Sequence, residues 1–430
     1  MVSRFPRRLG LVVDPQAIRL VELEQTADGP QLIQRLIQDL PPMQEAAAFD
    51  RLSWLQGALK EINMREVEVA ISGAGVAIRR LHSPLMPKRE LHEALKWQIK
   101  DQLPFPIQDA VLSAQVLSEV WEKDIKKQDV LAAVALRSPL EELVRLVEAV
   151  GGRVHSVVPA ACALAHCVRS LMPEAASGSV AVVDVGASAT QVVIMKDGQI
   201  QLVRDVGIGD RHFTEALVGE VASEQGQIAI DRSKAEALKH QYGVLIESAE
   251  GSTEEGVPLF QLASLMRPVV EQLLTELSRV LDFYNVQVES AGVSRLLLCG
   301  AGTHRESFQR FLTDGLGLSV EAFNPLRHLT HQLPISASDA LVEEGSQLAV
   351  AIGAALAHGQ GVNLLPVSLR RRASDRQARR QWLVAGVGLA LLIMGGLAGL
   401  GTTVILQQQR VLKQQRAWAA IEPFYEQSVY

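Results

Sequence analysis

This chain of 430 residues has few cysteines and no excess of positive charge. Its three cysteines form no CxxC pair, and so few thiols are typical of a reducing compartment. Cys162 and Cys167 flank His166, a spacing that could suggest a metal, but the run 160–169 is helix-like and favours buried side chains. The formal net charge of −6 gives no basic footprint, which argues against a nucleic-acid partner.

The N-terminal residues are not expected to act as a secretion signal. Arg4, Arg7 and Arg8 precede an apolar run, 9–13, that is too short for the core of a signal peptide. With 48% apolar and 21% charged residues the chain is expected to be globular rather than disordered. Residues 1–369 are therefore predicted to lie in the cytoplasm.

One long stretch near the C-terminus carries no charge. Residues 382–406 are 25 residues without Asp, Glu, Lys or Arg, enough to span a bilayer as a tilted helix. A buried soluble helix is the alternative, but the length, the flanks and six glycines argue against it. Three basic residues follow the stretch and six arginines precede it: Arg370, Arg371, Arg372, Arg376, Arg379 and Arg380. This bias predicts a single-pass inner-membrane protein with a large cytoplasmic N-terminal domain and a short periplasmic tail, 407–430.

The most informative motif is a strand that ends in an aspartate and returns as a second strand. Residues 180–195 run through Asp184, turn over Gly186 and Ser188, and return through Thr190. Such a hairpin can present backbone N–H groups and a hydroxyl to a phosphate, with a carboxylate beside it for Mg²⁺ or its water. The N-terminus repeats the pattern around Asp14, which predicts a duplicated α/β domain that closes over a nucleotide. Asp14 and Asp184 are the candidate metal ligands, although either could simply cap a turn.

Further residues of the second half are candidates for the adenosine side of the site. Gly300 and Gly302 follow a buried strand and allow close approach of a base or ribose, or they only form a tight turn. Glu236 and Lys239 share one face of a predicted helix, where they either flank the nucleotide or form a solvated pair. Helices are also expected over 213–223 and 262–286, and a small-residue helix that packs closely over 348–358.

No residue pattern indicates a catalytic base for phosphoryl transfer. In-line attack needs a group that orients the nucleophile, and none is marked here. The histidines, among them His82, His92 and His155, show no spacing typical of a metal site or a Ser/His/Asp arrangement, so core or surface positions are expected for them. Nucleotide binding without appreciable turnover is therefore predicted, and no catalytic residue is assigned.

The order of these motifs resembles the actin-like ATPase superfamily and, within it, the PilM family of type IV pilus assembly. The resemblance lies in residues 93–106, with their Pro-Phe-Pro turn, and in 184–190, 204–209, 235–243 and 299–303. It implies a duplicated actin-like (ribonuclease-H-like) α/β fold over 1–360, with an inserted FtsA/PilM-type subdomain at about 80–158 and a second half at about 179–330. It also implies ATP and Mg²⁺ as ligands, with Gly209 and Thr303 added to the nucleotide site. The match departs at Pro15, which follows Asp14 where the family has Gly and Ser, and which contributes no N–H to a phosphate.

The segment 363–410 resembles the start of PilN, which opens with a short peptide before one transmembrane helix. In that family the peptide docks in a groove of PilM between its core and its inserted subdomain. The resemblance implies a docking peptide within the linker 361–381, in cis or between neighbouring chains, and partners among PilN/PilO-like, platform and motor proteins. A further self-association through Gly395 and Gly399 in the membrane stays open. The peptide residues are Asn363, Leu364, Leu365 and Pro366.

Three functions of different classes follow from these patterns. The favoured one is a membrane-tethered, nucleotide-binding scaffold of the inner-membrane platform for type IV pilus assembly, whose nucleotide state sets the closure of its halves. The second is a slow ATPase or kinase on the same fold, which the missing base disfavours. The third is an FtsA-like division protein, although such proteins attach through an amphipathic helix and this segment is uniformly apolar. A type II secretion platform protein, with an actin-like domain joined to one span, is a neighbouring alternative.

Overall fold

The computed structural model divides into two units, Met1–Pro366 and Val367–Tyr430. It describes residues 7–14, 17–27, 29–39, 51–60, 62, 66–174, 177–223, 226–246, 251–287, 292–301, 303, 306–331, 344–366, 368–369 and 405–417.

The first sheet of the N-terminal unit has six strands in the order β16-β3-β2-β1-β4-β8. Strands β1 to β3 form an antiparallel meander, and β4 and β8 continue the sheet in parallel from β1. The strands are β1 (Arg7–Val13), β2 (Ala17–Thr26), β3 (Gly29–Asp39), β4 (Val67–Ile71), β8 (Val154–Pro159) and β16 (Thr330–His331). Helices α1 (Arg51–Leu59), α4 (Ala160–Leu171) and α10 (Ala349–Ala357) belong to the same half.

The second sheet has five strands in the order β11-β10-β9-β14-β15. Its meander and its parallel continuation repeat those of the first sheet, β3-β2-β1-β4-β8, strand for strand. The predicted duplication of one α/β unit is therefore confirmed. The strands are β9 (Ser179–Val185), β10 (Thr190–Lys196), β11 (Gln199–Val206), β14 (Arg295–Gly300) and β15 (Ser319–Ala322).

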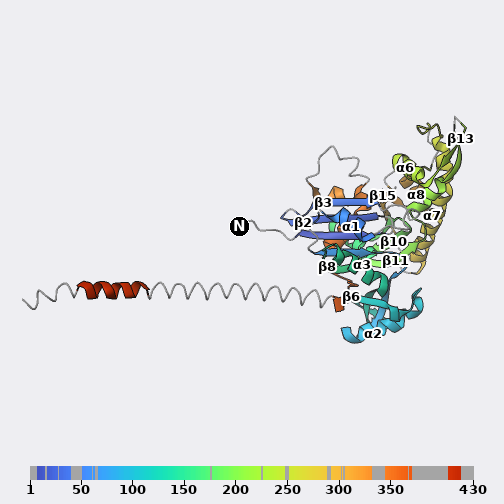
Figure 1. The fold of residues 1–430 in the computed structure, drawn as a ribbon. Coiled ribbons are helices and arrows are strands. Elements are labelled where there is room, and N and C mark those ends of the chain that lie inside the picture. Colours follow the sequence, from blue (N-terminus) through green and yellow to red (C-terminus); the bar gives the residue numbers. More distant parts are fainter. Residues whose placement is uncertain are drawn as a thin grey trace, which may run out of the picture. The chain divides into compact units, whose positions relative to one another are not determined.

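Four helices and a small hairpin complete the second half, on the right of the unit in Figure 1. The apolar faces of α5, α7 and α8 share one core with β9 and β10, in which Phe213 and Tyr284 are fully buried. These elements are α5 (Asp210–Leu217), β12 (Gly219–Ser223), β13 (Gly226–Ile230), α6 (Arg232–Tyr242), α7 (Leu259–Gln287) and α8 (Glu306–Leu316). The 3-10 turn η4 (Pro325–His328) leads from β15 back to the first sheet.

A third sheet, β5-β7-β6, is inserted between β4 and β8 and forms the lower end of the unit in Figure 1. It is wholly antiparallel, and α2 covers it with Leu91, Leu95 and Ile99, spaced by four residues on one helix face. The elements are β5 (Val76–Pro84), α2 (Lys88–Ile99), the short turns η2 (Lys100–Gln102) and η3 (Ile107–Asp109), β6 (Ala110–Glu122), β7 (Ile125–Leu136) and α3 (Arg137–Ala149).

Small residues allow α10 to lie directly on its neighbours, as its sequence predicts. A Cβ added to Gly353 would stand 1.9 Å from the carbonyl oxygen of Ala163 in α4. A Cβ added to Gly10 in β1 would stand 1.9 Å from the carbonyl oxygen of Ala351 in α10. Glycine is therefore required at both contacts, which hold the last helix of this half against its first strand.

The helix expected over 213–223 is wrong at its C-terminal end. Helix α5 begins at Asp210 and ends at Leu217, and residues 219–223 instead pair with β13 as a hairpin. Gly219 has a φ of +149°, which takes the backbone out of the helix, and Val221 is buried on the face of the hairpin. The apolar spacing of these residues suits either a helix or a strand, which is why the sequence alone predicts a longer helix.

In the C-terminal unit the structure describes a helix over 405–417, whose side chains are exposed. No helix among the described parts of the chain is long and apolar enough to cross a membrane. The predicted span, 382–406, lies outside the described residues up to position 404, as does the arginine run 370–380.

Candidate functional site

The turn after β9 is held in shape by the segment that leads into α5. The backbone N–H of Gly186 donates to the carbonyl oxygens of Asp184 and Ala189, both at 3.1 Å. The N–H of Asp210 donates to the Gly186 carbonyl at 2.9 Å, and a Cβ at Gly209 would stand 2.6 Å from that same oxygen. Gly186, Gly209 and the exposed Ser188 therefore lie together, as the sequence predicts for a phosphate turn.

Thr190 belongs to the same hairpin but faces the other way. Its side chain is fully buried, and its hydroxyl donates to the carbonyl oxygen of Ile208 at 2.7 Å. This hydrogen bond ties β10 to the segment after β11. Thr190 thus supports the turn through a buried hydrogen bond, and its hydroxyl is already bonded to the protein backbone.

The end of β14 lies against the end of β9. Gly300 pairs with Val185, and a Cβ at Gly300 would stand 2.3 Å from the Val185 carbonyl oxygen, at a φ of +101° that also favours glycine. The buried hydroxyl of Thr303 donates back to the Gly300 carbonyl at 3.0 Å. The predicted adenosine loop is thus adjacent to the phosphate turn, while Gly302 lies outside the described residues.

The two candidate metal carboxylates come from opposite halves, and the charge of one arginine acts on both. Arg19, in β2, forms a short ion pair with Asp14 at the end of β1, and both side chains are largely buried. Burial raises the pKa of Asp184 to about 6; the positive charge of Arg19 opposes this rise, and the negative charge of Asp14 adds to it. The thiol of Cys299 also points at Asp184, with Sγ and Oδ1 3.8 Å apart.

This donor set fits a magnesium-bound nucleotide in part. Two carboxylates in a desolvated place are suitable ligands for Mg²⁺ or for its waters. Arg19 already supplies positive charge to both of them, however, and so reduces what a metal would gain. No sequence pattern marks Arg19 as part of this site. Pro15 and Gln16, which follow Asp14, lie outside the described residues.

Glu236 and Lys239 belong to a buried ionic network behind the phosphate turn. The side chain of Lys239 is 4% exposed, and its ammonium group contacts Glu236 at 2.7 Å and Asp210 at 2.5 Å. It also donates to the hydroxyl of Thr214 at 2.7 Å. Burial raises the pKa of Asp210, and Lys239 opposes that rise. The alternative of a solvated pair is therefore wrong for Lys239, which fixes α6 to the first turn of α5, and the role of Glu236 and Lys239 beside a nucleotide stays a prediction.

The predicted docking peptide lies against its own chain, along the free edge of β8. The N–H of Leu364 donates to the Val157 carbonyl at 2.7 Å, and the N–H of Val157 donates to the side-chain oxygen of Asn363 at 3.2 Å. The N–H of Asn363 donates to the hydroxyl of Ser113 in the inserted sheet, also at 3.2 Å. Leu364 and Leu365 are 0% and 3% exposed. The peptide thus covers a sheet edge and joins the core to the inserted subdomain.

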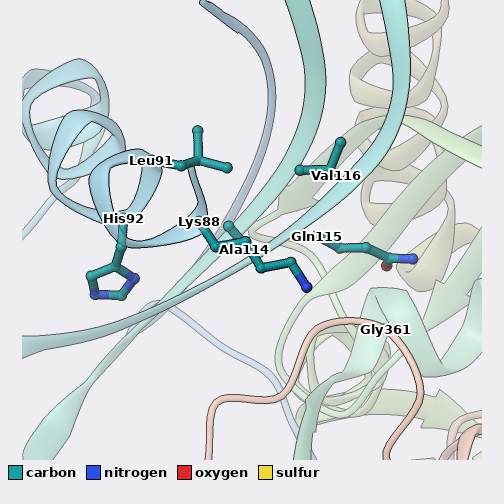
Figure 2. A pocket seen from close by; sticks show the side chains of 7 residues that line it. All are labelled: Lys88, Leu91, His92, Ala114, Gln115, Val116 and Gly361. Atoms are coloured by element: carbon teal, nitrogen blue, oxygen red, sulfur yellow. The ribbon is translucent and has the colours of Figure 1, made fainter. Parts of the chain in front are cut away.

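A groove of about 300 Å³ opens beside the start of this peptide. Figure 2 shows Lys88, Leu91 and His92 of α2 facing β6, with Gly361 on the loop that leads into the peptide. A Cβ at Gly361 would stand 3.2 Å from Gln115 in β6, and its φ is +81°. Glycine here lets the chain pass close to the inserted sheet.

The three cysteines are free thiols, of which Cys162 is only partly buried. Cys167 and Cys299 are fully buried, and burial raises the pKa of the Cys162 thiol to about 12. Such thiols are poor nucleophiles and poor metal ligands because the thiolate is disfavoured.

Comparison with known proteins points to the family that the sequence motifs resemble. A family model described as "Type IV pilus assembly protein PilM" matches residues 10–228 and 231–358. A solved "PilM-PilN type IV pilus biogenesis complex" is 25% identical, with a TM-score of 0.66 over 82% of this chain and 98% of the other.

Two further solved structures are similar at a lower level. One is the ethanolamine utilization protein EutJ from Carboxydothermus hydrogenoformans, 14% identical, with a TM-score of 0.46 over 82% of this chain and 89% of that one. The other is MreB 5 of Spiroplasma citri bound to AMPPNP, 14% identical, with a TM-score of 0.43 over 80% and 94%. Likeness at this level supports no inference about ligand or partner.

Proposed function

Since this chain belongs to the PilM family of type IV pilus assembly proteins, we propose that it is an actin-like scaffold of the inner-membrane assembly platform that carries its own docking peptide. The family match ends at residue 358, and the segment that follows supplies the PilN-like part. In this proposal residues 1–360 are the cytoplasmic body, 361–381 the docking peptide and basic linker, and 382–406 a transmembrane helix. The short tail, 407–430, is then periplasmic.

The observation that carries the proposal is the seating of residues 363–365. Four hydrogen bonds at 2.7–3.2 Å fix them to β8, to the inserted sheet and to one another. The similar solved structure is a complex of PilM with PilN. With the peptide held in cis, the scaffold's own chain would supply the segment that a PilN-like partner otherwise supplies. Other platform proteins would then bind elsewhere on the scaffold.

Tethering to the membrane rests on the sequence beyond the peptide. Residues 382–406 are free of charge, and six arginines precede them. Such a segment would cross the inner membrane with its arginine side in the cytoplasm. The arginines would also contact anionic headgroups.

Nucleotide is proposed to bind between the two halves. Gly186, Ser188 and Gly209 would surround the phosphates, Asp14 and Asp184 would face Mg²⁺, and Gly300, Gly302 and Thr303 would line the adenosine side. Bound ATP would supply a link between the halves, because a ligand that contacts both favours their closed arrangement. A switch of this kind requires binding and no turnover.

A peptide added in trans tests whether residues 363–366 of the same chain occupy the docking site. Full-length protein is titrated into a fluorescent peptide of residues 361–368, and its own peptide competes at a local concentration in the millimolar range. Leu364→Asp expels that peptide because the side chain is fully buried, and the added peptide should then bind at least about tenfold more tightly. Leu412→Asp, at a site 53% exposed, is the control and should behave as wild type. Equal binding by all three proteins would contradict docking in cis.

A further inference from the structure

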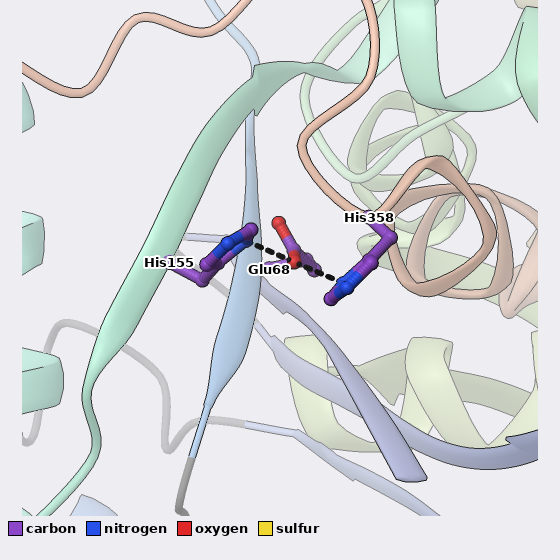
Figure 3. Close-up of side chains that lie close together, drawn as sticks. All are labelled: Glu68, His155 and His358. Atoms are coloured by element: carbon purple, nitrogen blue, oxygen red, sulfur yellow. Dashed lines mark hydrogen bonds and ion pairs between the residues drawn. The ribbon is translucent and has the colours of Figure 1, made fainter. Parts of the chain in front are cut away.

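A carboxylate is held between two histidines at the place where α10 ends and the docking segment begins. Figure 3 shows Glu68 between the imidazole rings of His155 and His358. One Glu68 oxygen lies 2.7 Å from Nδ1 of His155 and 3.1 Å from Nδ1 of His358. The rings are stacked with their centroids 5.0 Å apart. Two imidazoles and one carboxylate thus converge on one point.

The fold brings these residues together from three elements. Glu68 is on β4, His155 is on the adjacent strand β8, and His358 follows α10. The hydroxyl of Ser156 donates to the second oxygen of Glu68 and so fixes the orientation of the carboxylate. Metal sites commonly have such a supporting hydrogen bond.

The backbone around His358 is shaped to place its ring here. His358 adopts the left-handed conformation, with a φ of 43°, which few residues other than glycine occupy. A Cβ at Gly359 would stand 3.0 Å from Cε1 of His155, so glycine leaves room for that ring. An unfavourable conformation retained beside a converging set of ligand groups suggests that the position of the ring matters.

The donor atoms are arranged as a metal could use them. Those of Glu68, His155 and His358 all lie within 4.8 Å of one another. Ligands that share a Zn²⁺ at about 2.1 Å stand roughly 3.3 Å apart, so small rotations of the two rings suffice. Glu68 is buried, while the His155 and His358 side chains are 42% and 38% exposed, which gives a metal access and leaves positions for water.

We propose that Glu68, His155 and His358 bind one divalent transition metal of the zinc type. Two imidazole nitrogens and a carboxylate suit Zn²⁺, Co²⁺ or Ni²⁺ and not Ca²⁺ or Mg²⁺, which prefer oxygen ligands alone. The bound metal holds the end of α10 on the first sheet. Because Asn363 follows His358 by five residues, it also steadies the start of the docking peptide. Metal binding does not depend on the proposed function.

The test is a Co²⁺ and Zn²⁺ titration of full-length protein stripped with a chelator. We expect one equivalent of Co²⁺ to bind, with visible absorption bands of a low-coordinate site that one equivalent of Zn²⁺ removes. His358→Gln and Glu68→Gln should each weaken binding at least tenfold. His328→Gln is the control because His328 is exposed and distant from these ligands in the sequence, and it should bind as wild type.

Circular dichroism confirms that the variants are folded. His358→Gln alters a partly exposed side chain and is the variant of choice if Glu68→Gln does not fold. A second readout is protease cleavage between residues 359 and 369, which Zn²⁺ should slow in wild type and not in His358→Gln. The proposal is overturned if no stoichiometric metal binds, or if the His358 and His328 variants lose affinity equally.

Discussion

In the candidate nucleotide site, the ionised carboxylate of Asp184 lowers the stability of the folded protein. Its carboxylate is desolvated at the end of β9, with Asp14 nearby and Arg19 as the compensating cation. The pKa of about 6 in the folded protein exceeds the value of 3.8 expected in the unfolded chain. A folded state that retains a proton more strongly loses stability as pH rises between these two values. A structural role alone would be served better by a neutral side chain.

We therefore expect Asp184→Asn to stabilise the protein at pH 8 and not at pH 4. A pKa raised from 3.8 to about 6 means that the ionised carboxylate destabilises the folded state by about 3 kcal/mol. The asparagine carries no charge, so above pH 6 the variant is free of this destabilisation. At pH 4 the wild-type carboxyl is protonated in the folded state and close to half protonated in the unfolded chain, so the two proteins should differ by less than about 1 kcal/mol. Urea denaturation at the two pH values measures the difference. Asp282→Asn, on an exposed position of α7, is the control, and lower stability of Asp184→Asn at pH 8 would contradict the argument.

Arg19 acts at the same scale, as a cation that belongs to the protein. A unit charge at about 4 Å is worth roughly 4 kcal/mol at an effective dielectric of 20, so removal of even a third of this term changes metal affinity about tenfold. Arg19→Gln should therefore raise the affinity for Mg²⁺ at least about tenfold, as measured by calorimetric titration. Arg35→Gln breaks a different ion pair of the same sheet, with Glu344, and should leave Mg²⁺ binding unchanged. Equal affinities in wild type and Arg19→Gln would show that Arg19 and the metal do not compete.

At the scale of elements, glycines allow the backbones of neighbouring helices and strands to contact each other directly. Gly353 puts α10 against α4, and Gly10 puts β1 against α10. The segment after α10 then reaches β8 and covers the edge that the first sheet leaves free. The position of α10 therefore restricts where residues 363–365 can lie.

Gly353→Ala should destabilise the protein by about 2–3 kcal/mol, because its methyl group would meet the backbone of α4 and force the helices apart. Gly57→Ala in α1 is the matched control, since a Cβ there meets nothing within 4 Å. It should stabilise by up to about 1 kcal/mol through helix propensity. Thermal or urea unfolding distinguishes the two. Equal effects of both substitutions would contradict the packing argument.

At the scale of the whole molecule, local patterns predicted what local sequence controls. The duplicated strand–Asp–turn–strand units and the close-packed α10 follow from runs of adjacent residues, and the structure has both. The likeness of 363–366 to a docking peptide pointed to a groove between the core and the inserted subdomain, and Ser113 and Val157 provide its contacts.

Long-range pairings could not be predicted in this way. Glu68 lies 87 residues from His155 and 290 from His358, so no spacing rule links them. Arg19 reads as an ordinary charged residue of an alternating strand until its ion pair with Asp14 is seen. Lys239 looked like one member of a surface pair because Asp210, its buried partner, lies 29 positions away on another helix.

The most direct test of this account is disulfide trapping of the docked peptide in full-length protein. Ser113→Cys and Asn363→Cys place one thiol on each of two residues that now contact each other through the Asn363 N–H and the Ser113 hydroxyl, 3.2 Å apart. The native cysteines are poor competitors, because burial raises the pKa of Cys162 to about 12 and raises those of Cys167 and Cys299 further. We predict that mild oxidation of the double variant gives a crosslink within one chain, seen as an altered mobility at monomer size, and that neither single variant does so. A crosslink found only in dimers would contradict docking of the peptide on its own chain.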